Sequence, residues 1–217
     1  MNLTKTDKLA IERNDSNYIC LKGAVLYEKT EFKDAFEYYH LAAAMGNVQA
    51  ISNLGYCYLY GRDIPQNIDL GIAYFKIAAT KGNIDANYKL GDIYSRDKYV
   101  KEDKELAIYY YRNAASYLID DEWDKHSIMW NDELETYPSL CFALGRETMP
   151  NGDMNTDCIV SYAFLLKAKK GYEKYLNDGD IFYKDCYKRV LELLDNEWFD
   201  DIKDEFEDDD DDEDIEY

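Results

Sequence analysis

The sequence predicts an all-α protein built from repeated pairs of helices. One observation is internal similarity at a fixed spacing of 36 residues. A second is a set of apolar residues that recur at every fourth position, as on one face of a helix. A third is the scarcity of helix breakers, since the 217 residues include 3 prolines and 11 glycines. We therefore expect about four helix pairs followed by a C-terminal helix.

A shift of 36 residues superimposes nine identical residues in one register. The identical pairs are Gly46 and Gly82, Asn47 and Asn83, Ala50 and Ala86, Leu54 and Leu90, Gly55 and Gly91, Tyr58 and Tyr94, Tyr74 and Tyr110, Ala78 and Ala114, and Ala79 and Ala115. We expect repeats over residues 18–46, 50–82 and 86–118. A more divergent copy over 140–171 follows an insertion over 118–136, with Leu144-Gly145 in place of Leu54-Gly55 and Ala163-Phe164 in place of Tyr74-Phe75.

Each copy is predicted to contain two helices. In the first helix, Ala50, Leu54 and Tyr58 share one face, which we expect to lie in the core. Gly55 costs about 1 kcal/mol in a helix interior, and this loss favours a close approach of the neighbouring helix at that position. Gly46 stands just after a second helix, where a residue with positive φ is common.

The repeat resembles the Sel-one-like repeat family, relatives of the tetratricopeptide repeat. The family unit runs Ala-x3-Leu-Gly-x2-Tyr-x2-Gly, a loop, and a second helix ending in Ala-Ala-x2-Gly, and the second copy matches it at Ala50, Leu54, Gly55, Tyr58, Gly61, Ala78, Ala79 and Gly82. The third copy has Asp97 in place of the loop glycine, and the fourth has Leu140 and Thr148 in place of alanine and tyrosine. The resemblance implies an all-α, right-handed superhelix, or solenoid, whose first helices line a concave groove for a peptide or partner.

These patterns divide the chain into four segments. They are an N-terminal segment over 1–17, the repeat solenoid over 18–172, a capping helix over 173–197 that includes a helix from Ile181 to Leu194, and an acidic tail over 198–217. Five consecutive aspartates, Asp208 to Asp212, predict disorder in the tail. We expect residues from Asp204 onward to add little to packing. The tail either keeps the protein soluble or steers a basic partner.

Net charge narrows the classes of partner. The 25 Lys and Arg residues against 45 Asp and Glu give a charge of −20, which repels phosphate backbones and anionic lipid. We therefore exclude nucleic acid and membrane surfaces and favour a basic protein. The sequence has no run near the roughly 20 apolar residues that cross a bilayer and no signal peptide, so a cytoplasmic location is expected. Five cysteines without a CxxC pair indicate reduced thiols.

The sequence predicts no catalytic residue, no cofactor and no metal. The two histidines, His40 and His126, lack a metal-binding spacing, and no glycine-rich phosphate-binding loop is present. Cys57 is predicted to be a small buried thiol rather than a nucleophile. An enzyme is therefore the disfavoured alternative.

The positions opposite the core stripe are predicted to contact a partner. They are Tyr27, Gln49, Ser52, Tyr56, Tyr60, Tyr88, Asp92 and Arg96; the first copy also places Asn17, Cys20, Ala24 and Glu28 there. Tyrosines with acidic neighbours suit an extended segment that contains Lys or Arg. Relatives that bind a chaperone carboxylate repeat Lys, Arg and Asn along this groove, so such a clamp is not expected here. The alternative is that a chain with 22 tyrosines exposes several without a role.

The insertion contains a second candidate surface. Trp123, Trp130 and Leu134 would share one face of a helix, so an extra helix is expected. That face either packs on the solenoid or presents Trp123 and Trp130 to a partner.

The function predicted from these features is a non-catalytic adaptor or scaffold. It would bind a protein or peptide, most simply a basic one, in the concave groove. The alternative within binding is an immunity or inhibitor protein that neutralises a basic toxin or enzyme. The sequence leaves the partner and the oligomeric state open.

Overall fold

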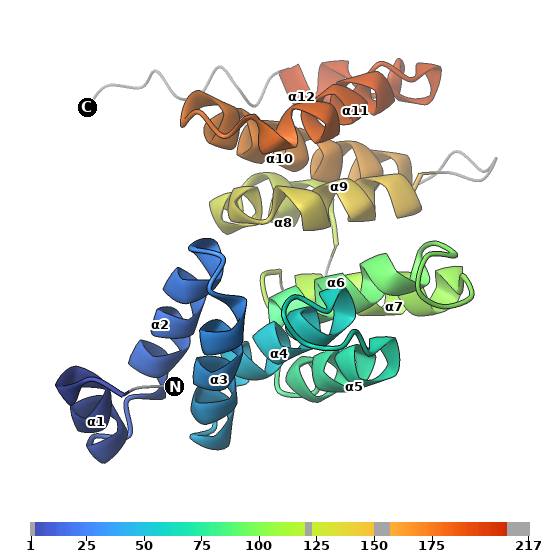
Figure 1. The fold of residues 1–217 in the computed structure, drawn as a ribbon. Helices are drawn as coiled ribbons and strands as arrows, with labels where there is room; N and C mark the ends of the chain where they lie inside the picture. Colours follow the sequence, from blue (N-terminus) through green and yellow to red (C-terminus); the bar gives the residue numbers. More distant parts are fainter. Residues whose placement is uncertain (1–2, 120–122, 150–156, 208–217) are drawn as a thin grey trace, which may run out of the picture. The chain divides into compact units, whose positions relative to one another are not determined.

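A computed structural model describes residues 3–119, 123–149 and 157–207, and within these ranges every regular element is an α-helix or a 3-10 helix. The chain forms two compact units, Met1–Ala114 and Ala115–Tyr217 (Figure 1). The predicted all-α repeat fold is confirmed.

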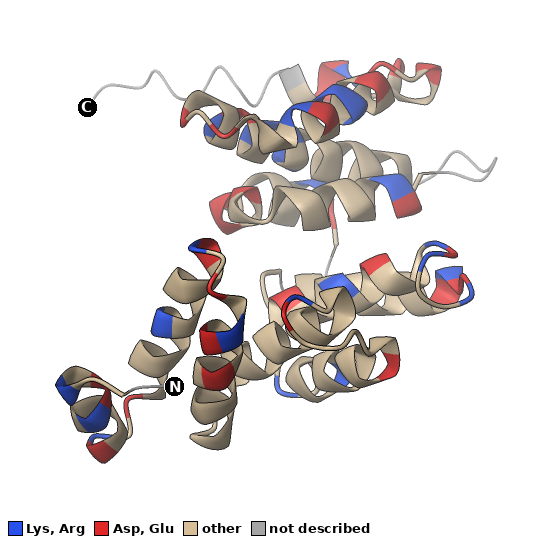
Figure 2. Cartoon of the chain, in the orientation of Figure 1, with Lys and Arg blue, Asp and Glu red and all other residues tan. Residues whose placement is uncertain are grey.

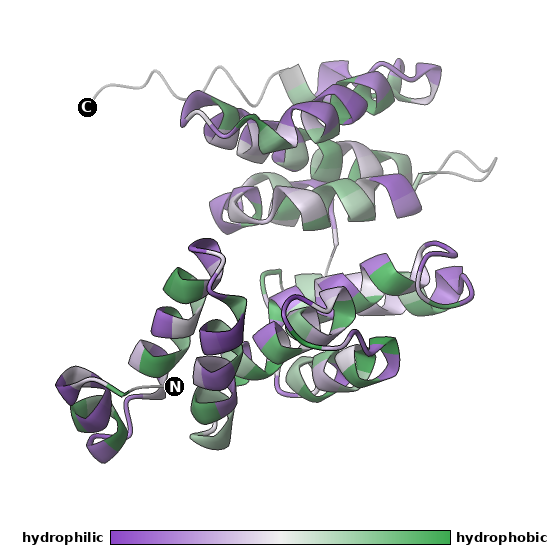
Figure 3. Cartoon of the chain, viewed as in Figure 1, coloured by the Kyte–Doolittle hydropathy of each residue, from purple (hydrophilic) through white to green (hydrophobic). Residues whose placement is uncertain are grey.

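The first unit consists of helices that pack in consecutive pairs. They are α1 (Lys5–Glu12), α2 (Ser16–Glu28), α3 (Phe32–Ala44), α4 (Val48–Tyr60), α5 (Ile68–Ala79), α6 (Ile84–Tyr94) and α7 (Lys104–Ala115). Helix α2 packs on α3 and α4 on α5, while α3 also packs on α4 and α5 on α6. Each of these helices carries both hydrophobic and hydrophilic residues, as expected for helices with one buried side (Figure 3).

The same turn joins one helix pair to the next. Gly46 has φ of 90° and Gly82 has φ of 82°, so the predicted positive φ is confirmed at Gly46. The asparagine that follows each glycine caps the next helix. The side chains of Asn47 and Asn83 accept hydrogen bonds from the backbone N–H groups of Ala50 and Ala86. The repeated Gly-Asn dipeptide therefore ends one helix and starts another.

Within each pair, an aromatic ring of the second helix packs against a glycine of the first. The pairs are Gly23 with Tyr39, Gly55 with Phe75, and Gly91 with Tyr111. A Cβ atom added at Gly55 would lie 2.8 Å from the Phe75 ring, and one added at Gly91 would lie 2.5 Å from the Tyr111 ring. A real Cβ atom does not come so close to a ring, so the close crossing predicted from Gly55 is confirmed.

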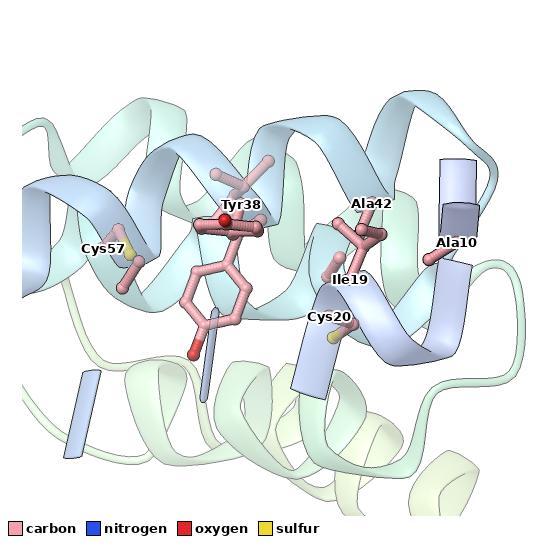
Figure 4. Packing of buried hydrophobic residues seen from close by; sticks show 10 residues of the cluster. Ala10, Ile19, Cys20, Tyr38, Ala42 and Cys57 are labelled. Carbon is pink, nitrogen blue, oxygen red and sulfur yellow. The ribbon is translucent and has the colours of Figure 1, made fainter. Parts of the chain in front are cut away.

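Side chains from α1 to α4 form one core cluster, and those from α4 to α6 form another. Figure 4 shows the first cluster, in which Ala10 of α1 joins Ile19 of α2 and Ala42 of α3. The second cluster includes Phe75 and Leu90. Each cluster joins helices of more than one repeat, and α4 contributes side chains to both clusters.

A buried ion pair holds α1 on this core. The Asp7 carboxylate is fully buried and accepts hydrogen bonds from Lys22 Nζ at 2.6 Å and from the Tyr38 hydroxyl at 2.8 Å. Burial raises the pKa of Asp7, but the hydrogen bonds from Lys22, Thr4 and Tyr38 outweigh it and hold the pKa well below its usual range. Helix α1, in the segment that the sequence left unassigned, is thus fastened to α2 and α3.

The second unit is built around one long helix, α10. Its elements are α8 (Lys125–Met129), η1 (Asp132–Thr136), α9 (Pro138–Glu147), α10 (Asp157–Asn177), η2 (Ile181–Tyr183), α11 (Lys184–Leu194), η3 (Glu197–Phe199) and α12 (Asp204–Glu207). Helix α10 packs against α8, η1, α9 and α11.

The α9–α10 pair shows the glycine contact of the first unit with a leucine in place of the ring. A Cβ atom at Gly145 would lie 2.7 Å from Leu165 Cγ. The residue that corresponds to Phe75 is therefore Leu165, one position beyond the predicted Phe164. The contact supports the fourth copy predicted over 140–171.

A second buried ion pair fixes the insertion to α10. Lys167 Nζ, fully buried, lies 3.1 Å from Glu135 Oε1, and Lys174 also binds Glu135. Gly171 lies directly against the backbone of Glu135, where a side chain would collide with the carbonyl oxygen. The insertion is thus held by polar contacts that a helical pattern does not reveal.

The C-terminal boundaries differ from the prediction. Helix α10 extends to Asn177, and α11 begins at Lys184 because Ile181–Tyr183 form a 3-10 turn. The acidic tail predicted from residue 198 is wrong over 198–207. Phe199 and Phe206 are buried there, with their rings 5.0 and 4.9 Å from that of Tyr162 on α10. The run Asp208 to Asp212 lies outside the described residues.

Replacing Gly55 by alanine is expected to destabilise the protein by about 1 to 3 kcal/mol, because the added methyl overpacks the Phe75 ring. The loss should appear although alanine is favoured over glycine in a helix by about 1 kcal/mol. Urea unfolding followed by circular dichroism measures it. The same substitution should cost less in a Phe75→Leu background, where the ring is absent. A higher unfolding midpoint for Gly55→Ala would contradict the close crossing.

A chain that ends at Lys203 is expected to be less stable than one that ends at Glu207, by about 2 kcal/mol or more, because it loses the buried Phe206 ring. All three tryptophans, Trp123, Trp130 and Trp198, belong to the second unit, so their fluorescence follows its melting alone. Phe206→Ala should reproduce the loss in the full chain. Equal melting temperatures for the two truncated chains would show that the 204–207 turn does not support the fold.

Candidate partner-binding surface of the first unit

Residues of α2, α3 and α4 line an open hollow in the first unit. Its volume is about 450 Å³. The lining residues are Asn17, Cys20, Leu21, Ala24, Tyr27, Glu28, Tyr39, Asn47, Gln49 and Asn53. Tyr27 and Gln49, which the sequence predicts as partner contacts, thus lie in one hollow. Asn53 is a lining residue that the helical pattern did not indicate.

A ladder of amide hydrogen bonds runs along this surface from one repeat to the next. Asn47 Nδ2 donates to Asn17 Oδ1 at 2.8 Å, and Asn83 Nδ2 donates to Gln49 Oε1 at 2.8 Å. Asn17 and Gln49 occupy equivalent positions in consecutive repeats. The capping asparagines Asn47 and Asn83 therefore each donate to the equivalent side chain of the preceding repeat. Gln49 Nε2 also donates to Asp85 Oδ2 at 3.1 Å. The ladder fixes the spacing of the helices around the hollow.

Two of the predicted contact tyrosines are partly structural. The Tyr56 ring lies edge-on to Phe75 with centroids 4.9 Å apart, and the Tyr88 ring lies 6.0 Å from Tyr111. Both partners are the rings that pack on glycines. Tyr60 stacks on Tyr56 and is 38% exposed, so it is the more accessible of this stacked pair.

Cations of the same chain already contact these rings. The Arg62 guanidinium lies 5.2 Å from the centroids of Tyr27 and Phe32 and 5.6 Å from Tyr60. Lys89 Nζ lies 5.7 Å from the Tyr60 centroid. Sequence reasoning missed both, because Arg62 is in a loop and Lys89 is adjacent to a predicted position rather than on it. Part of the cation–π capacity expected for a partner is therefore used internally.

Asp92 of α6 forms an ion pair with Arg96, which follows the end of the helix, and Lys89 Nζ lies 2.9 Å from Asp92 Oδ2. A partner that binds Asp92 would have to compete with these two cations.

Ser52 was wrongly predicted as a surface contact. Its side chain is fully buried, and its hydroxyl has no hydrogen-bond partner among the described residues. Helix α4 packs against both α3 and α5, so more than one side of it is covered. A helical wheel that assumes a single buried face therefore misplaces this residue.

The predicted tryptophan face of the insertion is also wrong. The segment forms the short helix α8 and the 3-10 helix η1 instead of one helix. Trp123 precedes α8 and packs edge-on against Phe164, while Leu134 is fully buried. Trp130 is 74% exposed. Of the two predicted tryptophan contacts, Trp130 is the accessible one.

The thiols of the first unit are poorly placed for catalysis. Burial raises the pKa of Cys57 to about 11 and also raises the pKa of Cys20. Cys57 is thus the buried thiol that the sequence predicts. Within residues 3–119, 123–149 and 157–207, no three His, Cys, Asp or Glu side chains come together as a metal site would require. None of the helices in these ranges is long and apolar enough to span a membrane.

The sequence model of the Sel1 repeat matches residues 9–47, 48–83 and 84–116. These ranges contain the three glycine-centred helix pairs of the first unit. The chain belongs to the Sel1 repeat family.

Solved structures of similar proteins carry related repeats. A Sel1 repeat protein from Oxalobacter formigenes is 18% identical with a TM-score of 0.45, over 83% of this chain and 87% of the other. A protective antigen of uropathogenic Escherichia coli with an SLR fold is also 18% identical with a TM-score of 0.45. That alignment covers 79% of this chain and 48% of the antigen. Comparison with curated proteins gives no match.

The Sel1 repeats correspond to the predicted copies, with one difference at the start. The first match begins at residue 9, within α1, whereas the first copy was predicted from residue 18. The copy predicted over 140–171 is not among the matched ranges and stays a prediction. Sel1 repeat proteins generally serve as non-catalytic protein-interaction modules.

The net negative charge of the chain lies outside the first unit. Residues 1–114 contain 15 Lys and Arg and 15 Asp and Glu, so their net charge is zero, while residues 115–217 contain 10 and 30 and carry all −20. Figure 2 shows α4, at the centre of the candidate surface, without a charged residue. The candidate surface therefore carries amides, rings and a few individual charges rather than a large net negative charge.

Tyr56→Ala is expected to destabilise the first unit by about 2 kcal/mol, because Tyr56 packs on the Phe75 ring. Tyr60→Ala should change stability by less than about 1 kcal/mol, because its side chain is more exposed. Urea unfolding of the two variants, compared with the unchanged chain, measures the difference. Equal losses would show that the two rings contribute equally to the core.

Proposed function

We propose that the chain is a non-catalytic adaptor or scaffold that binds an extended segment of a partner protein on the inner side of α2, α4 and α6. The observation that carries this proposal is the hollow of about 450 Å³ that residues of α2, α3 and α4 line. Its volume falls within the range of about 300 to 1,000 Å³ that is usual for binding sites.

The chemistry of the hollow supports binding rather than catalysis. Four of its ten lining residues carry amides, which donate and accept hydrogen bonds but neither attack a substrate nor take up a proton at neutral pH. Its thiol, Cys20, is buried and has a raised pKa. The surrounding helices are held by glycine contacts and by the amide ladder, so the surface is preorganised for a partner.

The preference for a basic partner rests on the second unit. The contact surface belongs to a unit with no net charge, whereas residues 115–217 carry −20. Charge of this size acts over about 10 Å at 0.1 M salt and accelerates the approach of a basic protein. The same charge favours the second candidate function, an inhibitor or immunity protein for a basic toxin or enzyme. An enzyme stays the disfavoured alternative.

A photo-crosslinking amino acid placed at Leu21, which lines the hollow and is 64% exposed, tests the proposal. The control position is Ile77, 47% exposed on α5. The partner cross-linked from position 21 is identified by mass spectrometry, purified and titrated against Leu21→Lys and Ile77→Lys. We expect Leu21→Lys to weaken binding at least tenfold and Ile77→Lys to leave it within twofold.

A partner that cross-links from position 77 and not from position 21 would contradict the proposed surface. So would a partner whose affinity is unchanged by Leu21→Lys. The titration at two salt concentrations separates the role of charge, because steering by the second unit weakens as salt rises while contacts in the hollow persist.

A further inference from the structure

We infer that the hollow recognises a short extended peptide segment by its main-chain carbonyl groups and by one Lys or Arg side chain. Asn17 and Asn53 would donate to the carbonyls, and Glu28 would bind the cation. This inference rests on the proposed function and specifies the chemistry of the segment bound.

The amide ladder determines which ends of Asn17 and Asn53 are available. The Oδ1 atom of Asn17 accepts from Asn47, and the Oδ1 atom of Asn53 accepts from Gln49 Nε2 at 3.3 Å. Both asparagines therefore have their oxygen engaged and their NH2 group left to donate. Asn53 Nδ2 meets only the Cys20 sulfur, at 3.8 Å. Sulfur is a weak acceptor, so a peptide carbonyl would replace it readily.

Glu28 supplies the charge complementarity. It is exposed, it is the charged residue of the lining, and no cation among the described residues forms an ion pair with it. Arg62 contacts the neighbouring Tyr27 ring but is not part of the lining. A carboxylate without an ion-pair partner in a neutral unit favours a peptide cation over an anion.

The distance between these groups sets the length of the segment. Asn17 and Glu28 lie at the two ends of α2, and a rise of about 1.5 Å per residue separates them by about 16 Å along the helix. An extended chain covers this distance in about five residues at roughly 3.3 Å each. Leu21 and Ala24 lie between them and offer an apolar wall for a side chain in the middle.

Peptides from a random heptapeptide display library, selected on the full chain, are the probe. The best binder is titrated by fluorescence anisotropy against the unchanged chain, Glu28→Lys and Asn53→Ala. The matched control is Glu12→Lys, because Glu12 is also an exposed acid at the last position of a helix but lies outside the hollow. Circular dichroism melts confirm that each variant is folded.

We expect the selected peptides to be enriched in Lys or Arg at one position. Glu28→Lys should weaken binding at least tenfold and Asn53→Ala about fivefold, while Glu12→Lys stays within twofold. Replacing peptide amides by esters one at a time lowers the acceptor strength of single carbonyls. One such ester should weaken binding to the unchanged chain and have no further effect on Asn53→Ala.

Several results would overturn the inference. They are the absence of any peptide binder, selected peptides without Lys or Arg, an unchanged affinity for Glu28→Lys, and an ester scan without effect. If the affinity of the cross-linked partner still depends on Leu21 in any of these cases, the proposed function stands and only the inferred peptide chemistry is wrong. If the affinity of that partner depends on Ile77 instead, both the proposed function and the inferred peptide chemistry are wrong.

Discussion

The packing of a ring on a glycine sets the geometry of each helix pair in the first unit. At Gly23, Gly55 and Gly91 the second helix comes closer than any side chain would allow. The same crossing brings Tyr58 onto Tyr74, with ring centroids 5.5 Å apart. Because each pair has the same internal geometry, the capping asparagines recur in register and the amide ladder can form. The candidate surface is thus a consequence of how the core packs.

Periodicity in the sequence predicted the helix pairs, the glycine crossings and the side of α4 that Leu54 buries, because these depend on local spacing. It failed where burial depends on distant elements. Ser52 is covered because α4 has neighbours on two sides, and Phe206 is buried although acidic residues surround it in the sequence. Of the hollow, Tyr27 and Gln49 were predicted contacts, and Asn17, Cys20, Ala24 and Glu28 were placed on the same surface. Asn53 was missed because nothing in its own helix marks it as a lining residue.

In the proposed function, the division of charge would separate two steps of recognition. The second unit carries the net charge and would act at long range on a basic protein. The first unit has no net charge and would select at short range, through hydrogen bonds whose directions the ladder fixes. Its rings are partly occupied by Arg62, which reaches Tyr27, Phe32 and Tyr60 from the loop after α4. That arginine also joins the first helix pair to the second.

The ion pair of Asp7 makes the stability of the N-terminal end of the fold depend on pH. Its folded-state pKa lies below the ordinary value of 3.8, so the unfolded chain takes up a proton more readily than the folded one. The stability that Asp7 contributes is complete at neutral pH and is lost as the pH falls below about 4. Since Lys22 and Tyr38 bind α1 through this carboxylate, protonation of Asp7 would weaken the attachment of α1 to α2 and α3.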